Sequence, residues 1–503
     1  MTDQEVPAEP AIAVDTYGGC IHVEWDPQAA VTPLGQLPFF IEFLKTAELF
    51  GPWVRDCPLT YGSPNAPRPT DVLGTLLLSV LAGHWRYAHI TTIRSDQVNP
   101  PLLGMRKVVS EDSVRRALRA MEEDTGIQWL QRHLRRCYEP LLYEPWILDM
   151  DVTIKPLYGH QEGADVGYNP HKPGRPAQAY HAYWIGNLRL ALEVEVHPGK
   201  QTASKYTRPG LWHLLDELPP GAWPSFLRGD CAFGTDGLMR EAEARRLPYL
   251  FKLKQTPGVK RLLTKVFGRS DWRAAGQGWE GVEASLQLQG WGQPRRVVVL
   301  RRVLKEGVVM ATPPEPAPGQ QLCVFLDPVE RMRTYEYVVL VTSLPDDILT
   351  LAQHYRDRAD MENNNDELKN QWGWGGYTTQ DLKRCQLMAR LVALVYNWWS
   401  LFVRLAIPER HAEALTSRPL LLEAVGRQTS HSGQTTLTLT SRHAKAPAVQ
   451  RRLRALGTYL RELRATAEQL DWQALWRTIL SRIFASFLDG RPLRAPMWLP
   501  NTS

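Results

Sequence analysis

The spacing of apolar residues changes once along the chain, near Trp146, and this change constrains the fold more than any other feature. From Leu37 to about Tyr143, apolar residues recur at the three- and four-residue intervals of amphipathic helices, interrupted by GSPNAPRP and NPPLLG. Beyond Trp146, the segments WILDMD, LRLALEVEV, FLRGD and YLFKLK have the pattern of strands. The helical patterns GLWHLLDEL and TDGLMREAEARR lie between the later strands. We therefore predict a helical unit and then a mixed α/β unit, in the order strand, strand, strand, helix, strand, helix, strand.

Beyond about residue 257, a β-rich segment is followed by further helical segments. From about residue 257 to 345, the segments GVEASLQLQGWG, RRVVVLRRV, QLCVFLD and TYEYVVLVTSL, broken by ATPPEPAPGQ, predict a small β-rich unit. Helix resumes at about Asp347 and is followed by an apolar helix over 382–404, while a polar stretch at 427–441 precedes a last helical segment. The expected division is a tail (1–36), a helical DNA-binding unit (37–143), a first catalytic segment (144–256), the β-rich insertion (257–345), a second catalytic segment (346–426) and a helical C-terminal region (427–503).

Length and composition exclude several classes of protein. A chain of 503 residues is too long for one compact core, and 44% apolar with 22% charged residues is typical of a folded protein and not of a disordered chain. The six cysteines are scattered singly, which argues against a zinc ribbon or a disulfide framework and favours a reducing cytosol. The apolar stretch from Leu391 to Val403 is shorter than the roughly 20 residues of a membrane span, so we expect a buried helix and no membrane partner.

Charge points only weakly to nucleic acid, so a polyanion would have to meet local basic patches. The formal net charge is +6, from 59 basic and 53 acidic residues. One such patch lies in SEDSVRRALRAMEE, where Ser110 can cap a helix whose outer face carries Arg115, Arg116 and Arg119. This pattern fits a helix that reads DNA, and it fits somewhat better an ordinary amphipathic helix with a solvated basic face. Both interpretations stay open.

Three positions carry carboxylates suited to phosphodiester chemistry, in which two divalent cations activate the attacking oxygen and stabilise the leaving oxygen. In WILDMD, Asp149 and Asp151 are two apart on a strand and therefore share a face. Asp230 closes FLRGD at the carboxyl end of a strand, where α/β sites gather, whereas Asp236 is the kind of acid that begins a helix. An aspartate at a strand end, taken alone, is more often a turn or cap residue than a metal ligand.

The third position is Glu362, on a late helix. Here Tyr355, Arg358, Glu362, Asp366 and Lys369 recur at three- and four-residue intervals and should occupy one face. A stripe of alternating charge is usually a solvated helix face, so the spacing alone does not decide. The order of strand, strand end and late helix, taken together, describes a ribonuclease-H-like metal site.

At this point the sequence resembles the DDE transposases of bacterial insertion sequences, specifically the superfamily marked by a Tyr-Arg-Glu-Lys signature, the IS-four superfamily. The signature is Tyr, two residues, Arg, three residues, Glu, six residues and Lys. The chain has these residues, at these intervals, at Tyr355, Arg358, Glu362 and Lys369.

Two further motifs carry the resemblance. The family shows Asp, any residue, Gly or Ala, then Phe or Tyr around its second acid, which matches Asp230, Ala232 and Phe233, and a Thr closely after its first acid, which matches Asp151 and Thr153. The segments LYGHQEGADVGYNPHKPGRP, VHPGKQT and YRDRADMEN are similar to the thirteen-eighty-like group. The resemblance spans roughly residues 70 to 410.

The resemblance implies an α/β fold, with a ribonuclease-H-like catalytic domain, a β-rich insertion before Glu362, and flanking helical N- and C-terminal regions. It implies a catalytic and metal-binding triad of Asp151, Asp230 and Glu362, with Asp149 in reserve for the first ligand. The implied cofactor is Mg²⁺, two ions per site, with Mn²⁺ as a substitute. Tyr355, Arg358 and Lys369 would contact DNA phosphate.

The resemblance also implies a biological setting. The partners would be double-stranded DNA, as transposon ends and as target, and a second copy of the chain in a homodimeric synaptic complex. The location would be the bacterial cytoplasm, in association with the nucleoid. Two other functions stay open: a domesticated or inactive DNA-binding protein, and a metal-dependent nuclease without strand transfer.

One departure from the family concerns a DNA hairpin intermediate. Relatives that form hairpins place tryptophans where this chain has Val338 and Ala359. Tyr335, Tyr337 or Trp291 would be the aromatics left to stack on a flipped base, or they pack within the β-rich insertion. For the C-terminal segment, helix packing through Leu453, Leu456, Leu460 and Leu463 competes with DNA contact through its arginines.

Overall fold

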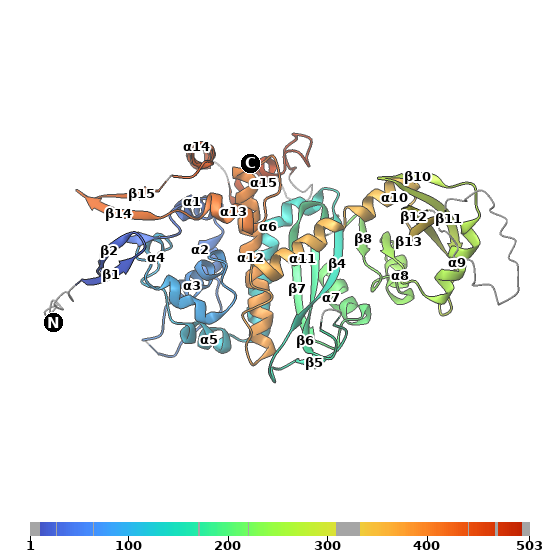
Figure 1. The fold of residues 1–503 in the computed structure, drawn as a ribbon, viewed down its shortest axis with the longest axis horizontal. Helices are drawn as coiled ribbons and strands as arrows, with labels where there is room; N and C mark the ends of the chain where they lie inside the picture. Colours follow the sequence, from blue (N-terminus) through green and yellow to red (C-terminus); the bar gives the residue numbers. More distant parts are fainter. Residues whose placement is uncertain are drawn as a thin grey trace, which may run out of the picture.

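A long central sheet with helical parts beside it forms the molecule (Figure 1). The computed structural model describes residues 11–26, 28–63, 65–169, 172–219, 221–307, 332–440, 442–467 and 471–494. Near the N-terminus the expected helical unit is confirmed, with helices α1 (Leu37–Thr46), α2 (Phe50–Arg55), α3 (Pro69–Leu81), α4 (Asn99–Leu102), α5 (Glu111–Ala120) and α6 (Glu123–Tyr138), and short 3₁₀ turns at Tyr87–Ile93 and Glu139–Tyr143.

Aromatic packing joins the N-terminal helices to the rest of the chain. The rings of Trp53 and Trp129 stack with centroids 5.5 Å apart, and Trp398, far along the sequence, meets Trp53 edge-on at 5.4 Å. All three side chains are fully buried. Large aromatic rings bury much apolar surface, and these three come from the helical unit and from the second catalytic segment. The helical unit and the two expected catalytic segments therefore share one hydrophobic core.

The first 36 residues, expected as a tail, contain strands. Strands β1 (Ile12–Thr16) and β2 (Gly19–Val23) pair as an antiparallel hairpin, and β3 (Val31–Thr32) pairs with β14 (Gly426–His431). The polar stretch at 427–441 is likewise ordered, since β14 pairs with β15 (Gln434–Leu439). Ser432 and Gly433 join them with φ of 48° and 77°, the left-handed values that a two-residue hairpin turn requires.

The central sheet has ten strands in the order β10-β11-β12-β13-β9-β8-β4-β6-β5, with β7 paired to β6. In β4 (Ile147–Pro156), β6 (Pro176–Ile185) and β7 (Leu190–Pro198) neighbouring strands are antiparallel, whereas β8 (Phe226–Gly229) and β9 (Tyr249–Lys252) run parallel to β4. Along the chain, helix α7 (Ser204–Asp216) joins β7 to β8, and helix α8 (Asp236–Ala244) joins β8 to β9. A two-residue strand β5 (Asp165–Val166) lies between β4 and β6, and a 3₁₀ turn (Gly186–Leu188) lies between β6 and β7. The predicted order of elements is confirmed, and the five core strands lie in the spatial order β7-β6-β4-β8-β9.

The insertion differs from the prediction in two ways. Residues 257–267 are helix α9 (Pro257–Phe267), because Thr256 caps its start, Pro257 suits the first turn, and its apolar residues fall on one face. Strands β10 (Arg273–Gly276), β11 (Trp279–Leu286), β12 (Arg295–Gly307) and β13 (Met332–Thr342) extend the central sheet, since β13 pairs with β9. The segments ATPPEPAPGQ and QLCVFLD lie outside the described residues.

After the insertion come α10 (Ile348–Arg356), α11 (Ala359–Gln371) and α12 (Leu382–Ala406). Side-chain amides of α12 satisfy the free edge of β7: Asn397 bonds both backbone groups of Ala191 at 2.9 and 2.8 Å, and Gln386 does the same for Val196. The expected buried helix at 382–404 is confirmed. No helix in the described residues is both long and apolar enough to cross a membrane.

The C-terminal region comprises α13 (Ala414–Leu421), α14 (Ala446–Ala467) and α15 (Trp472–Ile483). Of the two roles considered for this segment, α14 shows helix packing, because four leucines at helical spacing are buried: Leu453, Leu456, Leu460 and Leu463. Two arginines of the same helix meet acids of other elements, Arg464 with Glu42 and Arg452 with Glu409.

Candidate active site

Strand β4 lies in the middle of the core sheet and presents Asp149 and Asp151 on one face. Asp149 is fully buried, and its two oxygens accept from Arg228 Nε at 2.5 Å and Arg228 Nη2 at 2.6 Å. Gly186 makes room for this pair, since a Cβ there would lie 2.1 Å from Asp149 Oδ2. Both oxygens of Asp149 are therefore engaged in a structural ion pair, which argues against the reserve assignment of this residue as a metal ligand.

Asp151 is the more open of the two aspartates, with a side chain 21% exposed. Its Oδ2 accepts from Asn365 Nδ2 at 2.6 Å, and its Oδ1 lies 3.2 Å from Arg358 Nη2. Asn365 Oδ1 in turn accepts from the indole of Trp184 at 3.0 Å. The carboxylate is thus oriented from α11 and from strand β6.

Asp230 comes directly after β8 and lies beside Asp151. In the parallel pairing of β4 with β8, Met150 is opposite Gly229, so the next residues along both strands are Asp151 and Asp230. Asp230 Oδ1 accepts from the backbone N–H of Ala232 at 2.9 Å, which fixes the carboxylate in the turn. Asp236 begins α8 as expected and pairs with Arg295 at 2.7 Å, away from this turn.

Glu362 reaches the same region from α11. The helical stretch around it is interrupted, because α10 ends at Arg356 and α11 starts at Ala359 with Arg358 as its N-cap. The single helix expected through Tyr355 and Glu362 is therefore two helices, although Tyr355, Arg358 and Glu362 still lie together. The guanidinium of Arg358 is buried and pairs with the carboxylate of Glu362, whose side chain is 62% exposed.

The electrostatics show that these groups act on one another. Burial raises the pKa of Asp151, the guanidinium of Arg358 opposes that rise, and the negative charges of Asp230 and Glu362 add to it. Burial also raises the pKa of the Tyr355 phenol, which Asp230 and Glu362 raise further. Three carboxylates thus share one buried cation, Arg358, which is 3% exposed.

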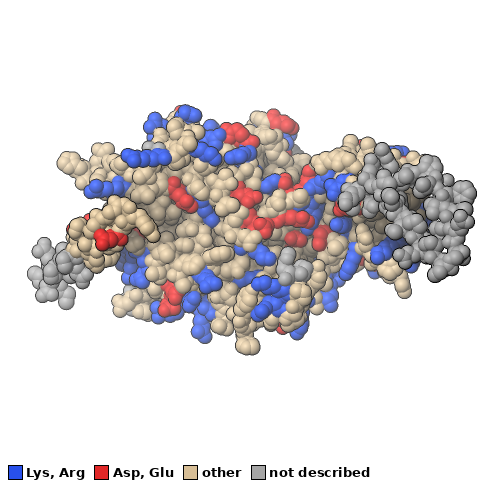
Figure 2. All heavy atoms as spheres, viewed as in Figure 1, with Lys and Arg blue, Asp and Glu red and all other residues tan. Residues whose placement is uncertain are grey.

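Figure 2 shows acidic side chains gathered near the middle of one face, over the region where Figure 1 draws α11, with basic side chains around them. Lys369, the last member of the spaced set, lies seven residues beyond Glu362 on α11, about 10 Å along the helix axis. Burial lowers the pKa of Lys369, and Asp366 opposes this. The structure therefore brings Tyr355 and Arg358 to the carboxylates and leaves Lys369 two turns away.

The predicted basic helix is α5, with Ser110 as its cap: the Ser110 side chain accepts from the Ser113 N–H. Its arginines are not equivalent. Arg115 lies over the ring of Tyr87 at 5.2 Å and within 3.9 Å of Glu111, while Arg116 and Arg119 are exposed.

The donor set fits divalent cations in kind. Carboxylate oxygens are the ligands that Mg²⁺ and Mn²⁺ prefer. The single positive charge of Arg358 does not balance the three carboxylates when they are ionised, so a bound cation would be electrostatically favourable. Among the described residues, Asp151, Asp230 and Glu362 do not gather their oxygens within the 4.8 Å span that another cluster achieves. A pair of ions about 3.5 to 4 Å apart suits this wider spread.

Two functional partners escaped the sequence analysis: Arg228, which holds Asp149, and Asn365, which holds Asp151. An arginine inside an apolar strand, two residues before an acid, is a signal for a buried ion pair. Asn365 lies in the run NNN, where nothing marks one asparagine over its neighbours.

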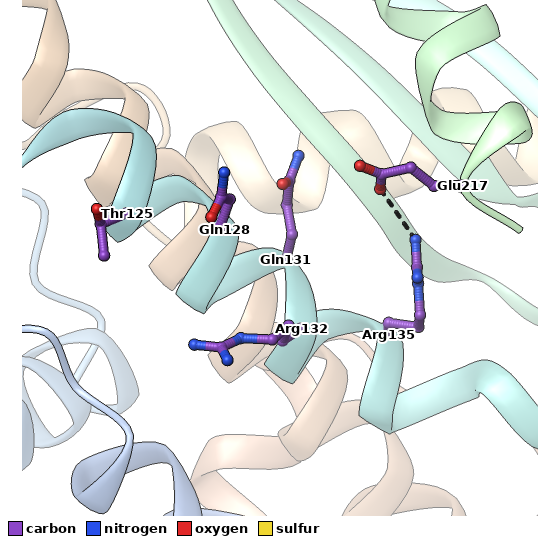
Figure 3. A pocket seen from close by; sticks show the side chains of 6 residues that line it. All are labelled: Thr125, Gln128, Gln131, Arg132, Arg135 and Glu217. Atoms are coloured by element: carbon purple, nitrogen blue, oxygen red, sulfur yellow. Dashed lines mark hydrogen bonds and ion pairs between the residues drawn. The ribbon is translucent and has the colours of Figure 1, made fainter.

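A broad hollow lies elsewhere on the molecule (Figure 3). It has a volume of about 610 Å³ and follows the outer face of α6 to the end of α7, where Arg135 pairs with Glu217 at 3.0 Å. None of the three carboxylates lines it. Its lining is Thr125, Gln128, Gln131, Arg132, Arg135 and Glu217.

Comparison with known proteins adds two positive findings. A family model described as transposase DDE domain group 1 matches residues 66–463. A solved structure, the cryo-EM structure of a piggyBac transposase synaptic complex with hairpin DNA, is similar at 12% identity and a TM-score of 0.40, over 95% of this chain and 89% of that chain. No curated protein sequence matches the chain.

Proposed function

The chain belongs to the family described as transposase DDE domain group 1, and from this premise we propose that it is a DNA transposase. In this proposal it binds terminal inverted repeats and carries out Mg²⁺-dependent cleavage and strand transfer. The observation that carries the proposal is the convergence of Asp151, Asp230 and Glu362 from β4, the end of β8 and α11.

Asp151, Asp230 and Glu362 are the proposed metal-binding triad. Divalent cations held there would activate the attacking oxygen and stabilise the leaving 3′ oxygen. The protein's own contribution is orientation: Asn365 fixes Asp151, and the backbone N–H of Ala232 fixes Asp230. Arg358 compensates the carboxylate charge.

Tyr355 is a proposed phosphate contact beside the triad, with Arg358 as a second. Lys369, two turns farther along α11, is proposed to contact phosphate farther along the DNA. Arg358 can reach phosphate only by leaving Asp151 or Glu362, because its guanidinium pairs with both. Farther away, Arg116 and Arg119 on α5 are proposed to contact the DNA backbone, since exposed cations without acidic partners bind phosphate and release counterions. A synaptic homodimer, an insertion-sequence origin and a bacterial cytoplasmic location complete the proposal.

One experiment distinguishes a transposase from a metal-dependent nuclease and from a DNA-binding protein without catalytic activity. The protein is incubated with Mg²⁺, labelled linear DNA carrying the element's terminal repeats, and a target plasmid. Joined product supports the transposase. Cleavage without joining would replace it with a metal-dependent nuclease, and specific binding without cleavage would replace it with a domesticated DNA-binding protein.

A further inference from the structure

A second cluster of ligand-type side chains lies on the other face of the core sheet. Strand pairing sets His181 directly opposite Glu195, and His197 follows two residues later on β7, so the three side chains share one face. Asp151 pairs with Ala182, the neighbour of His181, which puts His181 on the face opposite Asp151. One ligand atom from each of the three side chains lies within 4.8 Å of the other two. Among the described residues, this is the group of three histidine, cysteine or acidic side chains whose ligand atoms lie this close together.

Gln201 fixes both imidazole rings from outside the cluster. His181 Nε2 lies 2.6 Å from the backbone oxygen of Gln201, and His197 Nδ1 lies 3.1 Å from Gln201 Oε1. Carbonyl oxygens only accept, so the proton of each ring sits on these outer nitrogens. The lone pairs then belong to His181 Nδ1 and His197 Nε2. An outer N–H held by a carbonyl is the arrangement that orients metal-binding histidines.

The inner nitrogen of His197 faces a second acceptor. His197 Nε2 lies 3.3 Å from Glu195 Oε2, so a lone pair meets a carboxylate oxygen unless a proton or a metal ion stands between them. Two ligands of a tetrahedral zinc ion, with bonds of about 2.0 to 2.1 Å, are separated by about 3.3 Å. The spacing is therefore that of two neighbouring zinc ligands.

The third ligand is chemically ready. His181 is fully buried, and the backbone oxygen of Gln201 holds the proton on Nε2, so the lone pair on Nδ1 is left for an ion. The Thr207 hydroxyl, 3.1 Å from Nδ1, is a rotor that can turn away.

The surroundings of Glu195 are shaped for its carboxylate. Tyr183 donates its hydroxyl to Glu195 Oε2 at 3.1 Å. Gly210 on α7 leaves space, since a Cβ there would lie 2.2 Å from the same oxygen. The side chains of Glu195 and His197 are 24% and 23% exposed, which gives an ion a way in from solvent.

We propose that His181, Glu195 and His197 bind one Zn²⁺ ion, with water at the fourth position. Two imidazole nitrogens and one carboxylate oxygen form a donor set that suits zinc, whereas the all-carboxylate set on the other face suits Mg²⁺. The ion ties β6 to β7 and, through Gln201, to the segment that leads into α7. This site is independent of the proposed transposase function.

The test measures metal on the full chain after treatment with a chelator. The protein is dialysed against Zn²⁺ and then against buffer, and bound zinc is determined by elemental analysis. One equivalent is expected for the unaltered chain, with a higher melting temperature than the chelator-treated form. Glu195→Gln and His197→Gln should each lose the zinc and the increase in melting temperature.

His213→Gln is the matched control. His213 and Glu217 form a similar pair at 3.2 Å on α7, but the His213 side chain is 69% exposed and no third ligand joins them in the described part of the chain. This variant and Glu362→Gln should both retain the equivalent of zinc. Zinc loss equal in His213→Gln and His197→Gln would overturn the assignment.

Co²⁺ provides a measurement that needs no variant. Added to the chelator-treated chain, it should produce the intense visible absorption of a tetrahedral site, displaced by one equivalent of Zn²⁺. No such absorption, together with no retained zinc, would mean that His197 and Glu195 share a proton as an ion pair, and the proposal would be wrong.

Discussion

Arg358 Nη2 lies 3.2 Å from Asp151 Oδ1, and the same guanidinium pairs with Glu362. The cation thus stands between two of the carboxylates that we propose as metal ligands. A guanidinium and a divalent cation both require these oxygens, so binding of the ion has to displace or share the contacts of Arg358. This competition can be measured.

Arg358→Ala should lower the melting temperature in the absence of metal, because three carboxylates lose the buried cation that compensates them. Added Mn²⁺ should then raise the melting temperature of this variant more than that of the unaltered chain. Arg356→Ala is the control, since Arg356 donates to the backbone oxygen of Ala275 and to Gln353 and not to a carboxylate. Equal responses to Mn²⁺ in all three proteins would remove Arg358 from the metal site.

Asp149→Asn should lower the free energy of unfolding by about 3 to 5 kcal/mol, because it leaves the charge of Arg228 buried and uncompensated. Denaturant unfolding followed by tryptophan fluorescence measures this. The surface pair of Arg302 and Glu336, with side chains 45% and 40% exposed, is the comparison, and Glu336→Gln should change stability by less than about 1 kcal/mol. A small effect of Asp149→Asn would mean that this carboxylate is available for a different role.

The arginines of α5 should differ in their contribution to DNA binding. Arg116→Ala and Arg119→Ala should each reduce the salt dependence of binding by about one unit of slope, because each removes one phosphate contact. Arg115→Ala should do less, since Tyr87 and Glu111 already hold that guanidinium. Binding measured over a series of salt concentrations decides. Unchanged slopes would leave the ordinary solvated helix face as the correct interpretation.

Lys155 should give stability a distinct dependence on pH. Burial lowers its pKa from 10.5 to about 8. Between these pH values the unfolded chain holds a proton that the folded chain lacks, so stability rises with pH across the window and is lowest below pH 8. Lys155→Met should remove this rise, which amounts to at most about 3 kcal/mol.

Unfolding measured at pH values from about 7.5 to 10.5 tests this, with Lys200→Met as the control because the side chain of Lys200 is 67% exposed. The stability of Lys155→Met should stay flatter with pH than that of the unaltered chain and of the Lys200 variant. Parallel curves for all three proteins would show that Lys155 keeps its proton throughout.

How far the sequence determined the site can be seen residue by residue. The adjacency of Asp151 and Asp230 follows from period-2 strands and from parallel strand ends, both local patterns. A buried partner for Arg228 could be expected, but its identity as Asp149 could not be predicted, because it depends on the register that brings the two residues side by side. The contact of Arg358 with Asp151 depends on the packing of α11 against β4, which helical spacing alone does not signal.

The fold shows the same division between local and tertiary information. The core strands and helices were predictable from periodicity. The start of α9 was predictable from Thr256 and Pro257, a cap and first-turn pair, although the segment around it is rich in strand residues. The β14–β15 hairpin was predictable from the Ser-Gly turn at Ser432 and Gly433, although the stretch is polar. The continuation of the core sheet into the insertion was not predictable, since it is a pairing between β9 and β13, which lie far apart in sequence.

The most direct test of the central claim is Mg²⁺-dependent cleavage of a duplex that carries the element's own terminal inverted repeat. The unaltered chain should cut at the repeat boundary, Glu362→Gln and Asp230→Ala should bind the repeat without cutting, and Asp366→Asn, an exposed acid on the same helix that bonds Asn370, should cut normally. Comparable cleavage by the Glu362 or Asp230 variant, or specific binding without cleavage by the unaltered chain, would contradict the account.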